Sequence, residues 1–254
     1  MKNRVLVYHK VDVRPELGAG CISPKRFSQQ IEHLLNRGFE FGTLYDIRKN
    51  QNKTKLIALT FDDGYQNVFL YAYPILKEFG IPATLFLITN FLGAQNTWDV
   101  NLGGIKYQHL TIDNIAKLID NGWEIGSHGV SHCMLAGMPT STIREELCLS
   151  KQTLEQQFMT DVRYFCTPFG KLNRQIICEA QSAGYQGICG FFPFKYYKEN
   201  PPDFIIPRLA VYSFDTLRAL ERKLANNWQI RFEIIKQNVV NFCANGTVIV
   251  HNLK

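Results

Sequence analysis

Carboxylate and imidazole side chains follow several short apolar runs of this 254-residue chain, and these groups bind divalent metal ions and move protons. Asp62 and Asp63 come directly after one such run, and His128 and His132 come after another. The last apolar run of the chain ends at His251. Two acids and three of the six histidines therefore lie where a parallel sheet would gather reactive side chains.

The spacing of His128 and His132 lets two imidazoles converge on one ion, whether they lie on a helix face or in a tight loop. A carboxylate from another strand end would complete a site of two histidines and one aspartate, with open positions for water and substrate. A histidine pair of this kind is, on its own, more often two ordinary polar loop residues. The pair predicts a metal site only together with the two acids.

The neighbouring carboxylates of Asp62 and Asp63 would point to opposite faces of a continuing strand. Both can serve one site only where the strand ends, and Gly64 directly after them is typical of such an end. One carboxylate could then bind a metal ion while the other accepts a proton from water. The alternative is an N-cap for a helix that begins near Tyr65.

Apolar runs rich in β-branched residues predict the strands that must position these groups. They are Val5–Tyr8, Leu56–Phe61, Ala83–Thr89, Trp123–Ser127, Tyr164–Cys166, Gln186–Cys189, Ile205–Ala210 and Thr247–His251. The helices expected between them run from Ser23 to Gly38, from Tyr65 to Gly80 with an interruption at Pro74, from Thr111 to Gly122, and over Thr140–Phe158, Asn173–Ala183, Phe214–Ala225 and Arg231–Asn241. Such alternation predicts parallel strands joined by crossover helices.

The number of strand–helix units, seven or eight, matches a (β/α) barrel better than a Rossmann sheet. No GxGxxG or Walker sequence supports nucleotide binding. No linker rich in Pro, Gly or Ser divides the chain, so residues 1–254 are expected to form a single domain.

The overall composition is that of a globular protein, with 46% apolar and 20% charged residues, and no apolar stretch is long enough to be a transmembrane segment. The net charge of +6 comes from scattered Lys and Arg residues, so no nucleic-acid partner is expected. Seven cysteines without a CxxC pair favour reduced thiols. With no signal peptide recognisable, the sequence predicts a cytoplasmic protein, and peripheral association with the inner membrane face stays open.

Four segments, in this order, resemble the motifs of the polysaccharide deacetylase family, which is the NodB-homology group or carbohydrate esterase family four. They are Thr60–Gly64, Gly126–His132, Phe165–Gly170 and Val248–His251. Supporting stretches are Tyr8–Val11, Ile81–Phe86 and Gly122–His128. The resemblance spans nearly the whole chain, and its first two motifs are highly specific.

The resemblance implies a distorted (β/α)7-type, TIM-like barrel and a metal-dependent hydrolase that removes N-acetyl groups from amino sugars of a glycan or glycoconjugate. It implies that Asp63, His128 and His132 are the metal ligands. Asp62 matches the general base of the family, and His251 matches its general acid. The implied cofactor is a divalent ion, zinc in the first place, with cobalt, nickel or iron as alternatives.

Further residues of the site also come from the resemblance. The backbone N–H near Phe169 corresponds to the oxyanion donor, and Ile249 corresponds to the apolar residue that cups the acetyl methyl group. From the residues themselves, Trp98 could form a platform on which a sugar stacks, with an ordinary core tryptophan as the alternative. His9, at the end of the first predicted strand, could line the pocket or simply pack in the fold.

The sequence departs from the family pattern at two places. Many members have an arginine at the start of the third motif, paired with the base carboxylate, and this chain has Cys166 there. Arg208 or Arg163 could supply the charge, and Arg208 is the favoured candidate. The Asp-and-Trp motif that tunes the acid histidine has no clean counterpart around Asp203 or Asp215, which leaves a non-catalytic copy open.

Three other functions remain open on the sequence alone. An iron oxygenase shares the set of two histidines and one carboxylate, although such sites usually lie in all-β barrels. A glycan-binding module with a relic site would bind sugar without releasing acetate. A deacylase or deformylase could act on a small amide or on a lipid- or nucleotide-linked sugar. The expected partner is an N-acetylated carbohydrate, and no particular oligomeric state is predicted.

Overall fold

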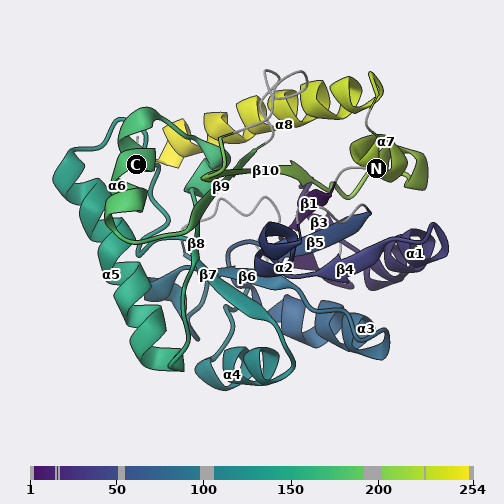
Figure 1. The fold of residues 1–254 in the computed structure, drawn as a ribbon, viewed down its shortest axis with the longest axis horizontal. Coiled ribbons are helices and arrows are strands. Elements are labelled where there is room, and N and C mark those ends of the chain that lie inside the picture. Colours follow the sequence, from purple (N-terminus) through teal and green to yellow (C-terminus); the bar gives the residue numbers. More distant parts are fainter. Residues whose placement is uncertain are drawn as a thin grey trace.

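Seven parallel strands close into a barrel (Figure 1) in the computed structural model, which describes residues 3–14, 16, 18–50, 55–97, 106–191, 202–225 and 227–251, without the side chains of 242–251. In order around the barrel they are β1 (Arg4–Tyr8), β5 (Leu56–Phe61), β6 (Thr84–Leu87), β7 (Glu124–Ser127), β8 (Tyr164–Cys166), β9 (Gly187–Phe191) and β10 (Ile205–Ala210). Val7 of β1 is in register with Thr60 of β5 on one side and with Ala210 of β10 on the other, which closes the ring. The predicted (β/α)7 barrel is confirmed.

Helices lie outside the barrel, and α8 runs along β10 (Figure 1). They are α1 (Pro24–Asn36), α2 (Leu44–Lys49), α3 (Tyr73–Glu78), α4 (Ile112–Asp120), α5 (Thr140–Phe158), α6 (Arg174–Ser182), α7 (Leu217–Leu224) and α8 (Ile230–His251), with the short helical turns η1 (Val68–Ala72), η2 (Thr89–Phe91) and η3 (Pro168–Gly170). Ser23, Thr111 and Asn173 each accept a hydrogen bond from the backbone N–H three residues further on. These caps explain why the starts of α1, α4 and α6 could be predicted.

Several short elements were not predicted. Strand β4 (Glu40–Gly42) pairs with the first half of β5, and the two-residue strands β2 (Lys10–Val11) and β3 (Cys21–Ile22) pair with each other in the loop after β1. Helix α2 begins with a capping box made by Thr43 and Asp46. All are too short for a hydrophobic period to be visible in the sequence.

The strand predicted at Thr247–His251 is wrong, because these residues belong to the last turns of α8. Since β1 pairs with both β5 and β10, the barrel closes without a further strand. The β-branched run therefore continues the helix, as tertiary context often overrides strand propensity. His251 and Ile249 lie within this helix, and their side chains are outside the described part of the chain, as is Trp98 altogether.

Strand residues alternate between the helices outside and the barrel interior. Tyr8 of β1 and Phe61 of β5 face outward, where their rings pack against Phe27 of α1 at 5.1 and 6.0 Å between centroids. The residues that follow them, His9 and Asp62, are thereby directed to the inner side. The backbone N–H of Asp62 still donates to the carbonyl of Tyr8 (3.0 Å), so the pairing of β1 with β5 extends to the first acid.

A partly buried carboxyl group, that of Glu124, lies at the opposite, amino-terminal end of the barrel. Oε2 of Glu124 accepts hydrogen bonds from Thr84 Oγ1 (2.9 Å) and from the N–H of Tyr45 (3.3 Å). Burial raises the pKa of Glu124 to about 7, although its hydrogen bonds with Thr84 and Tyr45 act in the other direction. A neutral carboxyl group is therefore favoured in the folded protein well above its ordinary pKa.

We expect Glu124 to make stability depend on pH. Its stabilising contribution is fully present below the ordinary pKa of 4.5 and is lost as pH rises through about 7, because the unfolded chain ionises first. From about pH 5 to about pH 8, the wild-type free energy of unfolding should fall by roughly 2 kcal/mol more than that of Glu124→Gln. Urea denaturation of both proteins at the two pH values measures the difference. Parallel pH dependence in the two proteins would contradict this account.

Candidate functional site

The two acids after β5 reach one site because the chain turns sharply between them. Asp63 has φ of +69° and Gly64 has the same value, so two successive residues adopt the left-handed conformation. A Cβ at Gly64 would lie 2.9 Å from Cδ2 of Leu87, so the turn also needs the space that a glycine leaves. The turn ends the strand and places the two neighbouring carboxylates in different hydrogen-bonding environments.

Asp63 meets both motif histidines. Its Oδ1 lies 3.3 Å from Nε2 of His128 and 3.3 Å from Nε2 of His132. All three side chains are buried, and their candidate ligand atoms lie within 4.8 Å of one another. Burial raises the pKa of Asp63, but the hydrogen bonds with the two histidines outweigh it and hold the pKa well below its ordinary value. One carboxylate and two imidazoles are a donor set that fits a divalent ion, with positions left for water and substrate.

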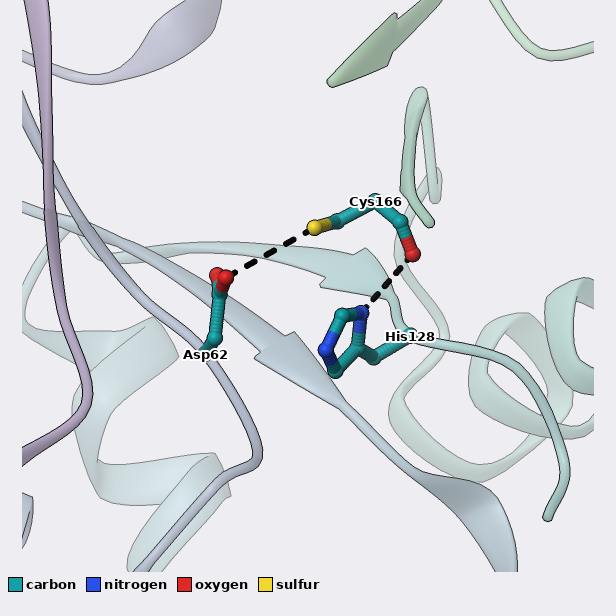
Figure 2. A group of neighbouring side chains, drawn as sticks. All are labelled: Asp62, His128 and Cys166. Atoms are coloured by element: carbon teal, nitrogen blue, oxygen red, sulfur yellow. Dashed lines mark hydrogen bonds between the residues drawn. The ribbon is translucent and has the colours of Figure 1, made fainter. Parts of the chain in front are cut away.

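A backbone carbonyl fixes the orientation of the His128 ring. Its Nδ1 lies 2.7 Å from the backbone carbonyl oxygen of Cys166 (Figure 2). Because a carbonyl only accepts, Nδ1 must donate to it, and Nε2 is the ring nitrogen that faces Asp63. Nε2 carries a proton where it bonds to the carboxylate, and loss of that proton leaves a lone pair that an ion could bind. This is the arrangement by which a backbone carbonyl selects the tautomer of a metal-binding histidine.

Glu146 of α5 shapes the loop that carries the histidines. Its Oε2 accepts hydrogen bonds from the N–H groups of Val130 (2.6 Å) and Ser131 (3.1 Å). A Cβ at Gly129 would lie 2.8 Å from the same oxygen, so the loop passes close to the carboxylate. Glu146 was not predicted as a site residue. The available signal was a charged residue next to Leu147, on the buried face of a predicted helix.

His109, to which the sequence analysis gave no role, holds the turn at Asp63. Its Nδ1 donates to the backbone carbonyl of Asp63 at 2.8 Å, and its ring stacks on Tyr65 at 4.9 Å between centroids. The contact is reinforced by a backbone bridge between Tyr65 and His109. His109 thus supports the backbone of the proposed ligand Asp63.

Backbone strain is concentrated at this site. In the part of the chain that the structure describes, non-glycine residues with positive φ are Lys55, Asp63, His132, Met159 and Phe169. Three of these five belong to or border the candidate ligand group of Asp63, His128 and His132, since the Phe169 ring lies 5.0 Å from that of His132. Left-handed backbone is unfavourable for such residues and persists where the surroundings enforce it, typically at functional sites.

Asp62 is held by Arg208 of β10. The guanidinium donates two parallel hydrogen bonds to the carboxylate, at 2.7 and 2.8 Å, and both side chains are buried. Burial raises the pKa of Asp62, but the Arg208 charge and hydrogen bonds outweigh it and keep the pKa below its ordinary value. Arg163, the other candidate for this charge, instead pairs with Asp161 at the surface. Asp62 is therefore an ionised carboxylate beside the proposed ligands.

Cys166 occupies the third-motif position where many family members have an arginine, and it lies within the same cluster (Figure 2). Asp62, His128 and Cys166 form a second group with metal-binding side chains. Arg208 donates to both Asp62 and the Cys166 sulfur (2.6 Å), so a cation there would meet a fixed positive charge. Burial raises the pKa of the Cys166 thiol to about 11, although Arg208 acts in the other direction. The group around Asp63 is the better candidate for the ion.

His9 lies at the carboxyl end of β1, next to β5. The residue before it, Tyr8, accepts a backbone hydrogen bond from Asp62, so His9 and Asp62 follow neighbouring strands at the same end of the barrel. The side chain is partly exposed, so it can meet a molecule that enters the barrel mouth. Its place after the first predicted strand was the signal in the sequence, and its role there was left open between lining the pocket and packing in the fold.

The remaining predicted positions are placed as follows. Phe169 lies in η3 with φ of +58°, its ring lies 5.0 Å from that of His132, and its role as oxyanion donor stays a prediction. Asp215 pairs with Lys223 of α7 (3.0 Å) and with Lys236 of α8. Asp215 thus links α7 to α8.

Among the helices that the structure describes, none combines the length and apolar character that a bilayer crossing needs.

The barrel resembles those of solved deacetylases. The deacetylase PplD of Streptococcus pyogenes, in complex with acetate, superposes with a TM-score of 0.75 at 20% identity, over 89% of this chain and 99% of that chain. IcaB from Ammonifex degensii also gives a TM-score of 0.75, at 21% identity, over 88% of this chain and 97% of that chain. These similarities establish the fold class as that of the deacetylase barrels.

The sequence gives the family. Residues 49–188, more than half of the chain, match the family described as polysaccharide deacetylase. The chain belongs to the polysaccharide deacetylase family, which confirms the resemblance found in the motifs.

Two curated relatives extend the comparison. YxkH of Bacillus subtilis (strain 168) is 26% identical over 187 residues, which are 72% of this chain and 62% of that protein. The poly-beta-1,6-N-acetyl-D-glucosamine N-deacetylase of Staphylococcus epidermidis is 27% identical over 212 residues, which are 77% of this chain and 70% of that protein. The chain thus spans less than two thirds of the length of YxkH.

Proposed function

We propose that this protein is a metal-dependent carbohydrate N-deacetylase that hydrolyses the N-acetyl groups of amino sugars in a glycan or glycoconjugate. The observation that carries the proposal is the pair of neighbouring acids, of which Asp63 meets His128 and His132 while Asp62 is paired with Arg208. Family membership supports it, and so does the relative named a poly-beta-1,6-N-acetyl-D-glucosamine N-deacetylase. The parallel barrel gives no support to the iron-oxygenase alternative.

Asp63, His128 and His132 would hold the ion. Zinc is the proposed metal because two imidazoles and one carboxylate with open positions form a common catalytic zinc site. When bound, the ion supplies a Lewis acid that polarises an amide carbonyl and lowers the pKa of water. Reconstitution of the metal-free protein with zinc, cobalt, nickel or iron, each followed by an acetate assay, ranks the candidates.

Asp62 is the proposed general base. Its carboxylate is ionised and held in one orientation by the two hydrogen bonds from Arg208. Oδ2 also accepts from the Cys166 thiol (3.7 Å), whereas Oδ1 retains a second lone pair, so Asp62 can still accept a proton from an attacking water molecule. The backbone N–H of Phe169 is proposed to donate to the developing oxyanion.

For the proton that the leaving amine needs, we propose His9 rather than His251. An imidazole can carry and release a proton near neutral pH, and His9 follows β1 next to β5 at the end of the barrel that carries Asp62, with its side chain partly exposed. His251 belongs to α8 rather than to a strand end at the barrel mouth.

Glutamine substitutions separate the two histidines. His9→Gln should lower kcat by about 100-fold with little change in KM, since it removes proton transfer to the amine. The loss in His9→Gln should exceed the loss in His251→Gln, with His33→Gln as the control because His33 pairs with Glu221 at the surface. Normal turnover by His9→Gln, together with loss in His251→Gln, would return the role to His251.

The function itself is tested with purified protein loaded with zinc. Free, polymeric, lipid-linked and nucleotide-linked N-acetylated sugars are incubated with it, and released acetate is measured. Acetate from at least one sugar class supports the proposal. Sugar binding without acetate release would favour a glycan-binding relic, and activity confined to small amides would favour the deacylase or deformylase alternative.

A further inference from the structure

Gln237 of α8 is buried, and its side-chain amide is bonded to the backbone of β10. Its Oε1 accepts a hydrogen bond from the N–H of Ala210 (2.7 Å), and its Nε2 donates to the carbonyl oxygen of Arg208 (3.3 Å). The two backbone groups flank a single residue, Leu209. The N–H and C=O groups of one residue in a neighbouring parallel strand would make the same two bonds.

The position of Gln237 in the sheet follows from the register. Leu209 and Val211 face β1, since Leu209 is in register with Leu6 and the N–H of Val211 donates to Val7. The carbonyl of Arg208 and the N–H of Ala210 therefore face the β9 side. The register between β9 and β10 runs as far as Phe191 and Arg208. The side-chain amide of Gln237 thus bonds to the β9-facing side of β10 directly after the last residue pair of that register.

The residue whose backbone Gln237 holds is the one that pairs with Asp62. The Arg208 guanidinium is tied at its far end to both oxygens of Asp62, to Thr60 Oγ1 (3.1 Å) and to the Cys166 sulfur. Such a bidentate contact tolerates little displacement, because both hydrogen bonds depend on one planar orientation. A shift of the β10 backbone would therefore be transmitted to the carboxylate.

We propose that Gln237 is a positioning residue, whose amide fixes the β10 backbone so that Arg208 meets Asp62 with both of its terminal nitrogens. Its effect on turnover rests on the proposed function above. The docking of α8 does not depend on this one side chain, because Ile234 is fully buried and Glu233 pairs with Lys223 of α7 (2.6 Å). Variants of Gln237 are therefore expected to fold.

The test is a double-mutant cycle. Gln237→Leu removes both hydrogen bonds and should lower kcat by about tenfold, with KM changed less than about twofold, because a displaced catalytic group loses rate steeply. Asn238→Leu, at the exposed neighbouring position, is the matched control. In an Arg208→Lys background, which lacks the pair of hydrogen bonds from the guanidinium to Asp62, Gln237→Leu should change kcat less than about twofold. A tenfold loss that persists in that background would overturn the proposal.

A crystal structure of Gln237→Leu gives a readout that does not need activity. The proposal predicts that at least one of the two contacts between Arg208 and Asp62 is lost, whereas both retained at 2.7 and 2.8 Å would overturn it. If no substrate yields acetate with the wild-type protein, the proposed function fails, and this structure still decides the role of Gln237.

Discussion

The Asp62→Asn variant should lose acetate release by about 1,000-fold while still binding a metal ion, because asparagine removes the proton acceptor and leaves the proposed ligands in place. Asp62 lies beside the ligand group, and its carboxylate is bonded to Arg208 instead. Steady-state acetate assays and zinc titration by calorimetry measure the two quantities on the same preparation.

A surface carboxylate provides the control for this variant. Asp161→Asn removes an acid that pairs with Arg163, and it should leave kcat unchanged. Asp62→Asn also leaves a buried guanidinium without its anion, so a lower melting temperature is expected. Normal hydrolysis by a folded Asp62→Asn protein would show that the base is elsewhere.

The second large effect is expected at the metal ligands. His132→Ala should weaken zinc binding by more than about 100-fold and abolish turnover at ordinary zinc concentrations, because two donors no longer enclose the ion. Chelation of the wild-type protein should give the same loss of activity. Zinc should restore the chelated wild type but not His132→Ala at the same concentration.

His33→Ala serves as the matched substitution, since His33 lies on α1 and pairs with Glu221 at the surface. It should bind zinc as the wild type does. Unchanged zinc affinity in His132→Ala would remove His132 from the ligand set, and activity that survives complete chelation would contradict a metal-dependent hydrolase.

The positive charge beside Asp62 comes from a different strand than the family pattern predicts. Cys166 is small at the position where many family members have arginine, and Arg208 reaches the same carboxylate from β10. The Arg208 guanidinium also lies 5.1 Å from the ring of Phe86, which covers its face. The chain thus has its arginine on a strand further along the barrel.

Much of the site could be predicted because it depends on local patterns. Asp62, Asp63 and His128 follow strands whose β-branched and apolar residues are visible in the sequence, and parallel strands bring their carboxyl ends together. The ends of β5, β8 and β10 agree with the predicted ranges. The strand ends therefore indicate the proposed ligands from the sequence alone.

The unpredicted parts depend on contacts between distant segments. Glu146 reaches Val130 across 16 residues, and Gln237 reaches Ala210 across 27. Both are polar residues on helices, and no local pattern shows which backbone groups they reach. The choice between Arg208 and Arg163 was likewise a matter of which strand faces Asp62.

The C-terminal run was misassigned for a related reason. Val248 and its neighbours have strand propensity, but the sheet is already closed by the pairing of β1 with β10. Whether a β-branched run becomes a strand depends on a free sheet edge, which no local pattern reports. Because His251 belongs to a helix and not to a strand end, His9 replaces it as the proposed acid.

The most direct test of the central claim is a crystal structure grown with zinc, with anomalous diffraction recorded at the zinc absorption edge. The account predicts a single strong peak bonded to Nε2 of His128, Nε2 of His132 and the carboxylate of Asp63, with Arg208 still on Asp62. A peak bonded to Asp62 and Cys166, or no peak beside Asp63 at zinc concentrations that support turnover, would contradict it.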